Sequence, residues 1–307
     1  MTTVALDANG LANHLARAGQ KLAPLYTVSG DEPLLVTEAV DALRAAARAA
    51  GYTDRSSLVM DARSDWSAVT AATQSVSLFG DRRVLEIKIP TGKPGKTGGD
   101  TLARLAEQAR AHPDPDTLVL VALPKLDKAT RDSKWAQALA AGGMMVDLAT
   151  IERPQLPAWI GARLARQNQH ADDATLQWMA DKVEGNLLAA HQEIQKLGLL
   201  YPEGELTAED VERAVLNVAR YDVFGLRDAM LTGDSARTLR MLEGLRAEGE
   251  ALPLVLWAVG EEIRLLARVA EARRLGQETG ALMRRLRIFG AHERLALQAL
   301  NRVPPQS

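Results

Sequence analysis

The chain has 307 residues, with a hydrophobic share of 47%, a charged share of 25% and a net charge of −2, and this length allows two or three domains. Because the net charge gives no overall attraction to nucleic acid, any DNA contact requires a local patch. The absence of cysteine excludes disulfides, thiol catalysis and cysteine-ligated metals. With no signal peptide and no membrane-length apolar run, the composition predicts a cytoplasmic protein without a membrane partner.

Residues 1–149 alternate helix-like and strand-like runs, which predicts a mainly parallel α/β sheet. The run Thr117–Ala122 is almost entirely apolar, as in a strand covered on both faces. Asp65 is a plausible N-cap for the helix that follows it. The expected strands are 25–29, 57–60, 84–89, 117–122 and 144–148, and the expected helices are 6–18, 33–50, 66–75, 101–111 and 128–141.

After Ala149 the pattern is helical, and Pro154 and Pro157 mark the boundary. A small helical domain is expected at 150–219, where Thr207 and Asp210 resemble a capping box. A second helical domain is expected at 220–307; since its last amphipathic helix is followed by so few residues, we expect further C-terminal helices to be missing. The expected helices are 159–168, 173–183, 187–200, 223–231, 235–248, 252–275, 281–287 and 291–301.

The stretch Thr91–Gly99 contains Gly95-Lys96-Thr97, which reads like the end of a phosphate-binding loop. The full pattern needs a glycine five residues earlier, where Pro90 stands, and Pro94 removes a backbone donor. The stretch also follows the third expected strand instead of the first. We therefore predict a mobile surface loop, with contact to a phosphate backbone as the alternative.

The first strand–helix junction, Ser29–Leu35, is where an ATP-binding domain would hold phosphate. Asp31 and Glu32 would repel a triphosphate there, and no Lys-Ser/Thr pair follows. The magnesium-binding acid expected at the end of Thr117–Ala122 is also missing, because the next acid is Asp127, beyond a proline. The order of elements suggests an ATPase fold, whereas both nucleotide-binding motifs are absent.

No residues suggest a catalytic, metal or cofactor site. The five histidines (14, 112, 170, 191 and 292) have no metal-ligand spacing, and no serine–histidine–acid arrangement is apparent. The basic run Lys125, Lys128, Arg131 and Lys134 predicts a solvated face, with DNA or subunit contact as the alternative. The arginines of the last helices allow either subunit contact or plain surface.

Leu78 and Phe79 stand where an expected helix ends and the chain turns at Gly80. They either pack into the protein's own core or project together as a hot spot for a partner. Ser75-Val76-Ser77-Leu78-Phe79 resembles the pentapeptide with which bacterial replication proteins bind the sliding clamp, although Ser75 stands where glutamine is common. Further similar motifs are Gly30–Leu35, Trp66, Glu184–Leu188 and Asp222–Ala229, in an order that resembles delta subunits of bacterial DNA polymerase III along essentially the whole chain.

This resemblance implies an AAA+-like domain that does not bind ATP, followed by two helical domains. It implies that Ser75–Phe79 binds the sliding clamp and that the protein opens the clamp ring for loading on primed DNA. Implied partners are the motor and delta-prime-type clamp-loader subunits, bound through a C-terminal collar, and DNA within the assembled complex. The implied protein has no intrinsic catalysis and no cofactor, since the DNA-directed DNA polymerase activity belongs to the holoenzyme. The alternatives are an AAA+ motor ATPase and a helical DNA-binding adaptor.

Overall fold

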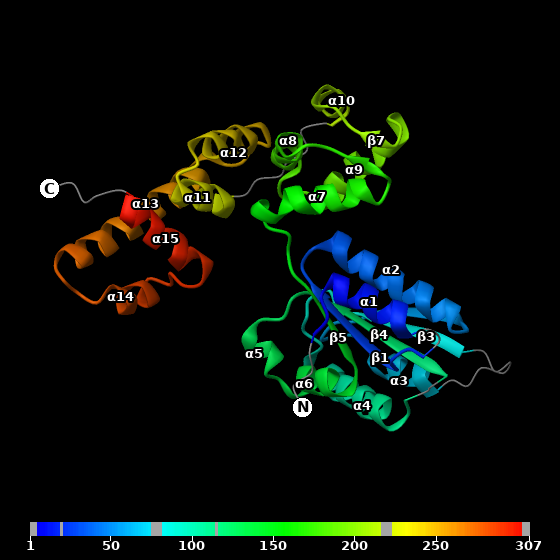
Figure 1. Ribbon diagram of the computed structural model, residues 1–307. Helices are drawn as coiled ribbons and strands as arrows, with labels where there is room; N and C mark the ends of the chain where they lie inside the picture. The colour runs from blue at the N-terminus through cyan, green and yellow to red at the C-terminus, as the bar shows by residue number, and fades with distance from the viewer. Residues whose placement is uncertain (1–4, 19–20, 75–81, 114–115, 216–222, 303–307) are drawn as a thin grey trace. The chain divides into compact units, whose positions relative to one another are not determined.

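The computed structural model describes residues 5–18, 21–74, 82–113, 116–215 and 223–302 (Figure 1). The chain divides into two compact units, Met1–Glu152 and Arg153–Ser307. Among the described residues, no helix combines the length and the apolar character needed to span a bilayer.

The first unit is built on five parallel strands in the order β2-β3-β4-β1-β5. Parallel neighbours require crossover connections, which the intervening helices provide. This confirms the predicted α/β sheet, although the second strand begins earlier than expected. The strands are β1 (Leu25–Gly30), β2 (Tyr52–Val59), β3 (Arg82–Lys88), β4 (Thr117–Leu123) and β5 (Met144–Leu148), and the helices are α1 (Ala8–Ala18), α2 (Pro33–Ala49), α3 (Ser67–Gln74), α4 (Gly95–Ala111), α5 (Lys128–Arg131) and α6 (Lys134–Gly142).

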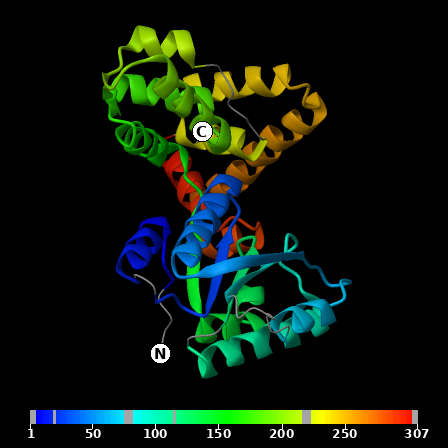
Figure 2. The ribbon, with the colours of Figure 1, turned by 90° about the vertical axis from the view of Figure 1, so that its right-hand side faces the viewer.

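Helices cover both faces of this sheet, with α1 and α2 on one face and α3, α4 and α6 on the other (Figures 1 and 2). The central strand β4 is buried on both faces, from Leu118 to Val121. Alternate strand residues such as Leu85 and Val121 pack with Leu102 of α4 and other apolar side chains of that second helical layer. The apolar composition of β4 follows from its central place in the sheet.

A buried ion pair lies on the face of the sheet that α2 covers. Glu86 of β3 is 2% exposed, and Arg44 of α2 donates to both of its carboxylate oxygens, at 2.7 Å and 2.6 Å. Burial raises the pKa of Glu86, but the hydrogen bond and charge of Arg44, together with the charges of Arg55 and Lys88, outweigh burial and hold this pKa below its usual range. A buried carboxylate is tolerated in β3 because these cations compensate it.

The stretch predicted as a surface loop at 91–100 is instead half helical, because α4 begins at Gly95. Gly98 and Gly99 are buried: a Cβ on Gly98 would lie 2.6 Å from Cζ2 of Trp66, and one on Gly99 would lie 3.2 Å from Cδ1 of Trp135. Glycine is therefore required sterically at position 98, where the helix lies against the flat indole. The loop prediction was wrong because these contacts are not visible in a local pattern.

The second unit is helical, as predicted. The N-terminal cap of α10 confirms the predicted capping box, since Thr207 Oγ1 accepts a hydrogen bond from the N–H of Asp210 while the Asp210 carboxylate accepts one from the N–H of Thr207. A short parallel pair, β6 with β7, was not predicted. The elements are α7 (Leu156–Ala165), β6 (Gln169–His170), α8 (Asp173–Val183), α9 (Leu187–Leu200), β7 (Gly204–Glu205), α10 (Ala208–Ala214), α11 (Val223–Thr232), α12 (Ser235–Ala247), α13 (Leu252–Arg274), α14 (Thr279–Arg285) and α15 (Ala291–Arg302), with a 3₁₀ turn at Arg153–Gln155.

Ion pairs connect parts of the second unit that are distant in sequence. Glu184, which follows α8, is 9% exposed and accepts hydrogen bonds from Arg237 of α12. Asp181 of α8 pairs with Arg153 and with Arg240. The bridges made by Arg237 and Arg240 join residues on both sides of the boundary expected near 219/220, and that boundary stays a prediction.

Replacing Arg44 with methionine should lower the free energy of unfolding by about 3 kcal/mol at neutral pH, because Glu86 would remain buried without its two hydrogen bonds from Arg44 and would keep only the longer contact with Arg55, at 3.7 Å, as an ion pair. Since the native pKa of Glu86 is depressed, the pair stabilises the fold above the pKa of an unfolded glutamate, and this contribution is lost as pH falls through the lower native pKa. The loss caused by Arg44→Met should therefore shrink in acid. Urea unfolding at several pH values measures both effects.

The matched control is Arg48→Met, which removes an exposed arginine one turn later on α2. This change should alter the free energy of unfolding by less than about 0.5 kcal/mol. Equal losses in the two variants would contradict the role given to the Arg44–Glu86 pair.

Replacing Gly98 with alanine should destabilise the first unit by about 1–3 kcal/mol, because the new methyl group would overlap the Trp66 indole. Gly280→Ala in α14 is the control, since the nearest contact of its Cβ is an ordinary 3.7 Å. Alanine has the higher helix propensity, so this control should be neutral or stabilising. Thermal unfolding of both variants measures the difference, and an unchanged melting temperature for Gly98→Ala would show that the packing adjusts.

Candidate functional site

The residues predicted to bind a partner, Ser75, Val76, Ser77, Leu78 and Phe79, lie outside the described residues, as does Gly80. The structure describes the two elements that this segment connects, the end of α3 and the start of β3. The structure thus describes how the two attachment points of the segment are held.

Helix α3 is fixed against the core at its start. Trp66 is 2% exposed and its Nε1 donates to the backbone oxygen of Asp61 at 2.9 Å. The carboxylate of Asp65 accepts a hydrogen bond from the N–H of Ser67 at 2.9 Å, as expected of a helix cap. Val69, one turn further on, is fully buried. These contacts give the helix leading to the segment a defined position in its domain.

The last turn of α3 and the first residues of β3 are also connected. Arg83 donates from Nη1 to the backbone oxygen of Ala72 at 3.3 Å. The guanidinium of Arg82 lies 4.3 Å from the ring centroid of Tyr52 and donates to its hydroxyl at 2.9 Å. The two arginines thus hold the start of β3 to both α3 and β2, so that the attachment points of residues 75–81 are braced by packed neighbours.

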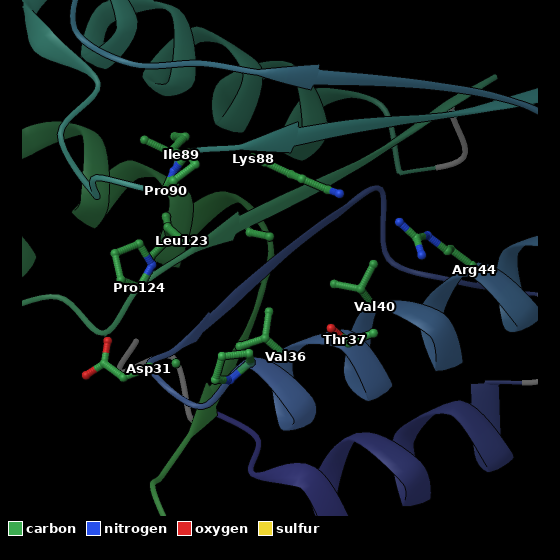
Figure 3. Close-up of a pocket in the computed structure, with 13 residues that line it drawn as sticks. Asp31, Val36, Thr37, Val40, Arg44, Lys88, Ile89, Pro90, Leu123 and Pro124 are labelled. Carbon is green, nitrogen blue, oxygen red and sulfur yellow. The ribbon is translucent and has the colours of Figure 1, made fainter. Parts of the chain in front are cut away.

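A second candidate site is a cavity of about 400 Å³ between α2 and the carboxyl ends of β1, β3 and β4 (Figure 3). The chain leaves β1 toward one face of the sheet and leaves β4 toward the other, so the cavity lies at the point where ligands usually bind in open α/β sheets. Its walls are mainly apolar, and they include Val36, Val40, Ile89, Leu123 and Pro124.

Two carboxylates of the protein itself lie at the N-terminus of α2, beside this cavity. Glu32 caps the helix by accepting from the N–H of Leu34 at 3.4 Å, and Pro33 has no N–H to offer. Asp31 accepts from the N–H of Lys125 at 2.9 Å and thereby links the loop after β1 to the loop after β4. At a helix N-terminus a phosphate is normally bound by backbone N–H groups. The negative charge of Asp31 and Glu32 would repel a phosphate from those groups here.

Two cations lie at the other end of the cavity, since Figure 3 shows Arg44 and Lys88 opposite Asp31. Arg44 is held by Glu86. Neither the Arg44–Glu86 ion pair nor the cavity beside it was predicted from the sequence. The available signal was Glu86 itself, because a carboxylate within an otherwise apolar strand requires a cation nearby.

Asp127, the nearest acid after β4, serves as the cap of α5. Its carboxylate accepts from the N–H of Thr130 at 2.7 Å, and this hydrogen bond is the main cause of a lowered pKa for Asp127. Within the described parts of the chain, no group of three or more His, Cys, Asp or Glu residues could hold a metal ion. Four of the histidines have hydrogen-bonding partners: the Tyr26 hydroxyl for His14, the backbone oxygen of Gln108 for His112, Arg163 for His191 and Glu262 for His292.

Comparisons with known proteins agree on one family. The family model for the DNA polymerase III delta subunit matches residues 26–148. The chain is 34% identical to DNA polymerase III subunit delta of Escherichia coli over 290 residues, which cover 94% of this chain and 82% of that protein. It is 28% identical to the protein of the same name from Haemophilus influenzae over 249 residues, covering 80% of this chain and 70% of the relative.

A solved structure of a DNA clamp loader delta protein from Bacillus subtilis matches the fold with a TM-score of 0.52 and 18% sequence identity. The match covers 97% of this chain and 88% of that chain, so the order of an α/β domain followed by helices is common to both. Because the identity to the E. coli relative extends along nearly the whole chain, the chain belongs to the DNA polymerase III delta subunit family.

Proposed function

We propose that this protein is a clamp-loader subunit that binds the sliding clamp through Ser75–Phe79 and opens its ring, so that the clamp can be loaded on primed DNA during replication. The observation that carries the proposal is the identity to a DNA polymerase III delta subunit along 94% of the chain. The pentapeptide resemblance and the braced ends of α3 and β3 support the choice of segment.

In this proposal Leu78 and Phe79 insert together into an apolar pocket of the clamp. Each side chain that becomes fully buried contributes roughly 1.5–3 kcal/mol. Opening requires that the protein bind the open ring more tightly than the closed one, because a ligand with equal affinity for both forms shifts no equilibrium. A rigid support for the anchor would transmit this difference, and the buried Trp66, which directly precedes α3, and Val69 of α3 provide one.

We further propose that this subunit does not itself bind ATP, which would act through the motor subunits. The carboxylates of Asp31 and Glu32 at the start of α2 support this, as does the use of Asp127 as a helix cap. The same features oppose the alternative of a motor ATPase. Contacts with the other loader subunits are proposed for the C-terminal helices, 220–307, as a collar.

The double variant Leu78→Ala/Phe79→Ala should bind the purified clamp of its own organism at least about 100-fold more weakly than the wild type, without ATP, because it loses two buried anchors. Isothermal titration calorimetry measures this difference. Its control is Leu275→Ala/Phe289→Ala, which removes one leucine and one phenylalanine that are 55% and 64% exposed elsewhere. The control should bind the clamp like the wild type.

Thermal unfolding of the same variants distinguishes the two alternatives for Leu78 and Phe79, which are partner anchors or residues of the protein's own core. If they are partner anchors, the double variant should melt within a few degrees of the wild type. A large loss of stability would place them in the core, and clamp binding equal to that of the wild type would exclude Ser75–Phe79 as the main anchor.

Adding 1 mM Mg-ATP should stabilise the wild type by less than about 0.4 kcal/mol, which is the limit when the dissociation constant exceeds the ligand concentration. The melting temperature with and without nucleotide measures this stabilisation. Binding to the clamp first shows that the protein sample is folded. A saturable increase in melting temperature with increasing ATP would instead support the motor alternative.

A further inference from the structure

The cavity between α2 and the carboxyl ends of β1, β3 and β4 has no part in the proposed clamp binding. Its volume of about 400 Å³ lies within the range of roughly 300–1,000 Å³ that is usual for small-molecule sites. One wall follows α2 from Pro33 through Val36 and Val40 to Arg44. At about 1.5 Å per residue, this stretch of helix is about 16 Å long. The cavity is therefore elongated along the helix.

The middle of the cavity is apolar. Val36 and Val40 of α2 lie opposite Ile89 and Leu123, which come from the ends of β3 and β4 (Figure 3). Thr37 contributes a hydroxyl, and the charged side chains of the lining lie toward the two ends. Such walls offer contacts to an alkyl chain and few hydrogen-bonding partners to a polar group such as a nucleobase.

The two ends of the cavity carry opposite charge. Asp31 lies at the end next to the N-terminus of α2, whereas Arg44 and Lys88 lie at the other end (Figure 3). An anionic group is repelled by the first end and attracted by the second. A ligand with one anionic head would therefore bind in a single orientation.

Lys88 is not needed to neutralise a carboxylate of the protein. Glu86 already accepts two hydrogen bonds from Arg44 and has Arg55 at 3.7 Å, and Asp41 pairs with Arg44. Lys88 is exposed and, in the part of the chain that the structure describes, takes part in no ion pair. Three cations thus stand against two carboxylates at this end of the cavity, and one bound negative charge would balance them.

We propose that this cavity binds an unbranched aliphatic carboxylate of medium chain length, with the chain between α2 and the strand ends and the carboxylate at Lys88 and Arg44. Burial of the chain supplies the affinity, and the charges set its direction. The site excludes a triphosphate, because its several negative charges would meet Asp31 or lie in the apolar middle. This inference goes beyond the proposed clamp binding and does not depend on it.

The test is isothermal titration calorimetry of the full chain with decanoate, below the concentration at which decanoate forms micelles. Decanoate should bind saturably, with one molecule per chain. From hexanoate to decanoate the affinity should rise by about four-fold for each added methylene. Neutral decanol and cationic decyltrimethylammonium should bind more weakly than decanoate, because neither carries the anionic head.

The variant Lys88→Gln should weaken decanoate binding by about five-fold, as expected for a partly exposed ion pair, and should leave decanol binding unchanged. Its control is Lys21→Gln, which removes the same charge from an exposed lysine that does not line the cavity. The control should bind decanoate like the wild type.

The variant Val36→Phe should reduce the affinity for both decanoate and decanol by at least about ten-fold, because the larger side chain fills part of the cavity. Its control is Ala42→Phe, at an exposed position of α2 that does not line the cavity. This control should bind both compounds like the wild type. The melting temperature of each variant shows whether it is folded.

The proposal is overturned if the wild type does not bind decanoate saturably, if decanol binds as tightly as decanoate, or if the folded Val36→Phe variant keeps its affinity. Membrane lipids carry the same chemistry, and flotation with vesicles of phosphatidylglycerol tests that source. Vesicle binding that Val36→Phe abolishes, without binding of free decanoate, would also overturn it. Clamp binding should be normal in Lys88→Gln, and a failure of decanoate to bind would leave the clamp proposal intact.

Discussion

The parallel arrangement of the five-stranded sheet is the constraint on which the rest of the first unit depends. In a parallel sheet every strand begins at one edge and ends at the other, so segments far apart in sequence are gathered by their place before or after a strand. The loops after β1, β3 and β4 come together at the carboxyl edge and form the cavity. The connection from α3 to β3 joins the sheet at the opposite edge.

Charges inside this framework have separate roles. At the start of α2, Glu32 and Asp31 hold backbone N–H groups in a place where nucleotide-binding domains hold phosphate. On the sheet face below α2, the buried Glu86 is neutralised by Arg44, whose side chain is 20% exposed. The carboxylates at both places therefore have partners within the protein.

Patterns of local sequence predicted most elements well. The predicted and observed helices agree at Asp173–Val183 and Leu187–Leu200, where apolar spacing and caps coincide. The segment predicted as one helix at 128–141 is helical but divided into α5 and α6, because Ser133 has an extended backbone. The helical start of α4 was also missed, since its glycines suggested a loop while the Trp66 ring required them. Packing against a distant aromatic residue overrides local propensity in such cases.

By itself, the sequence determined the class of fold, because alternating apolar periods specify which segments become strands and which become helices. It also determined that the N-terminus of α2 carries negative charge, since Asp31 and Glu32 precede the helix directly. Only the tertiary structure decided that Arg44 neutralises Glu86 and that Gly98 lies on Trp66. These relations join residues that are 30 or more positions apart, and strand order and helix packing, which no local pattern contains, bring them into contact.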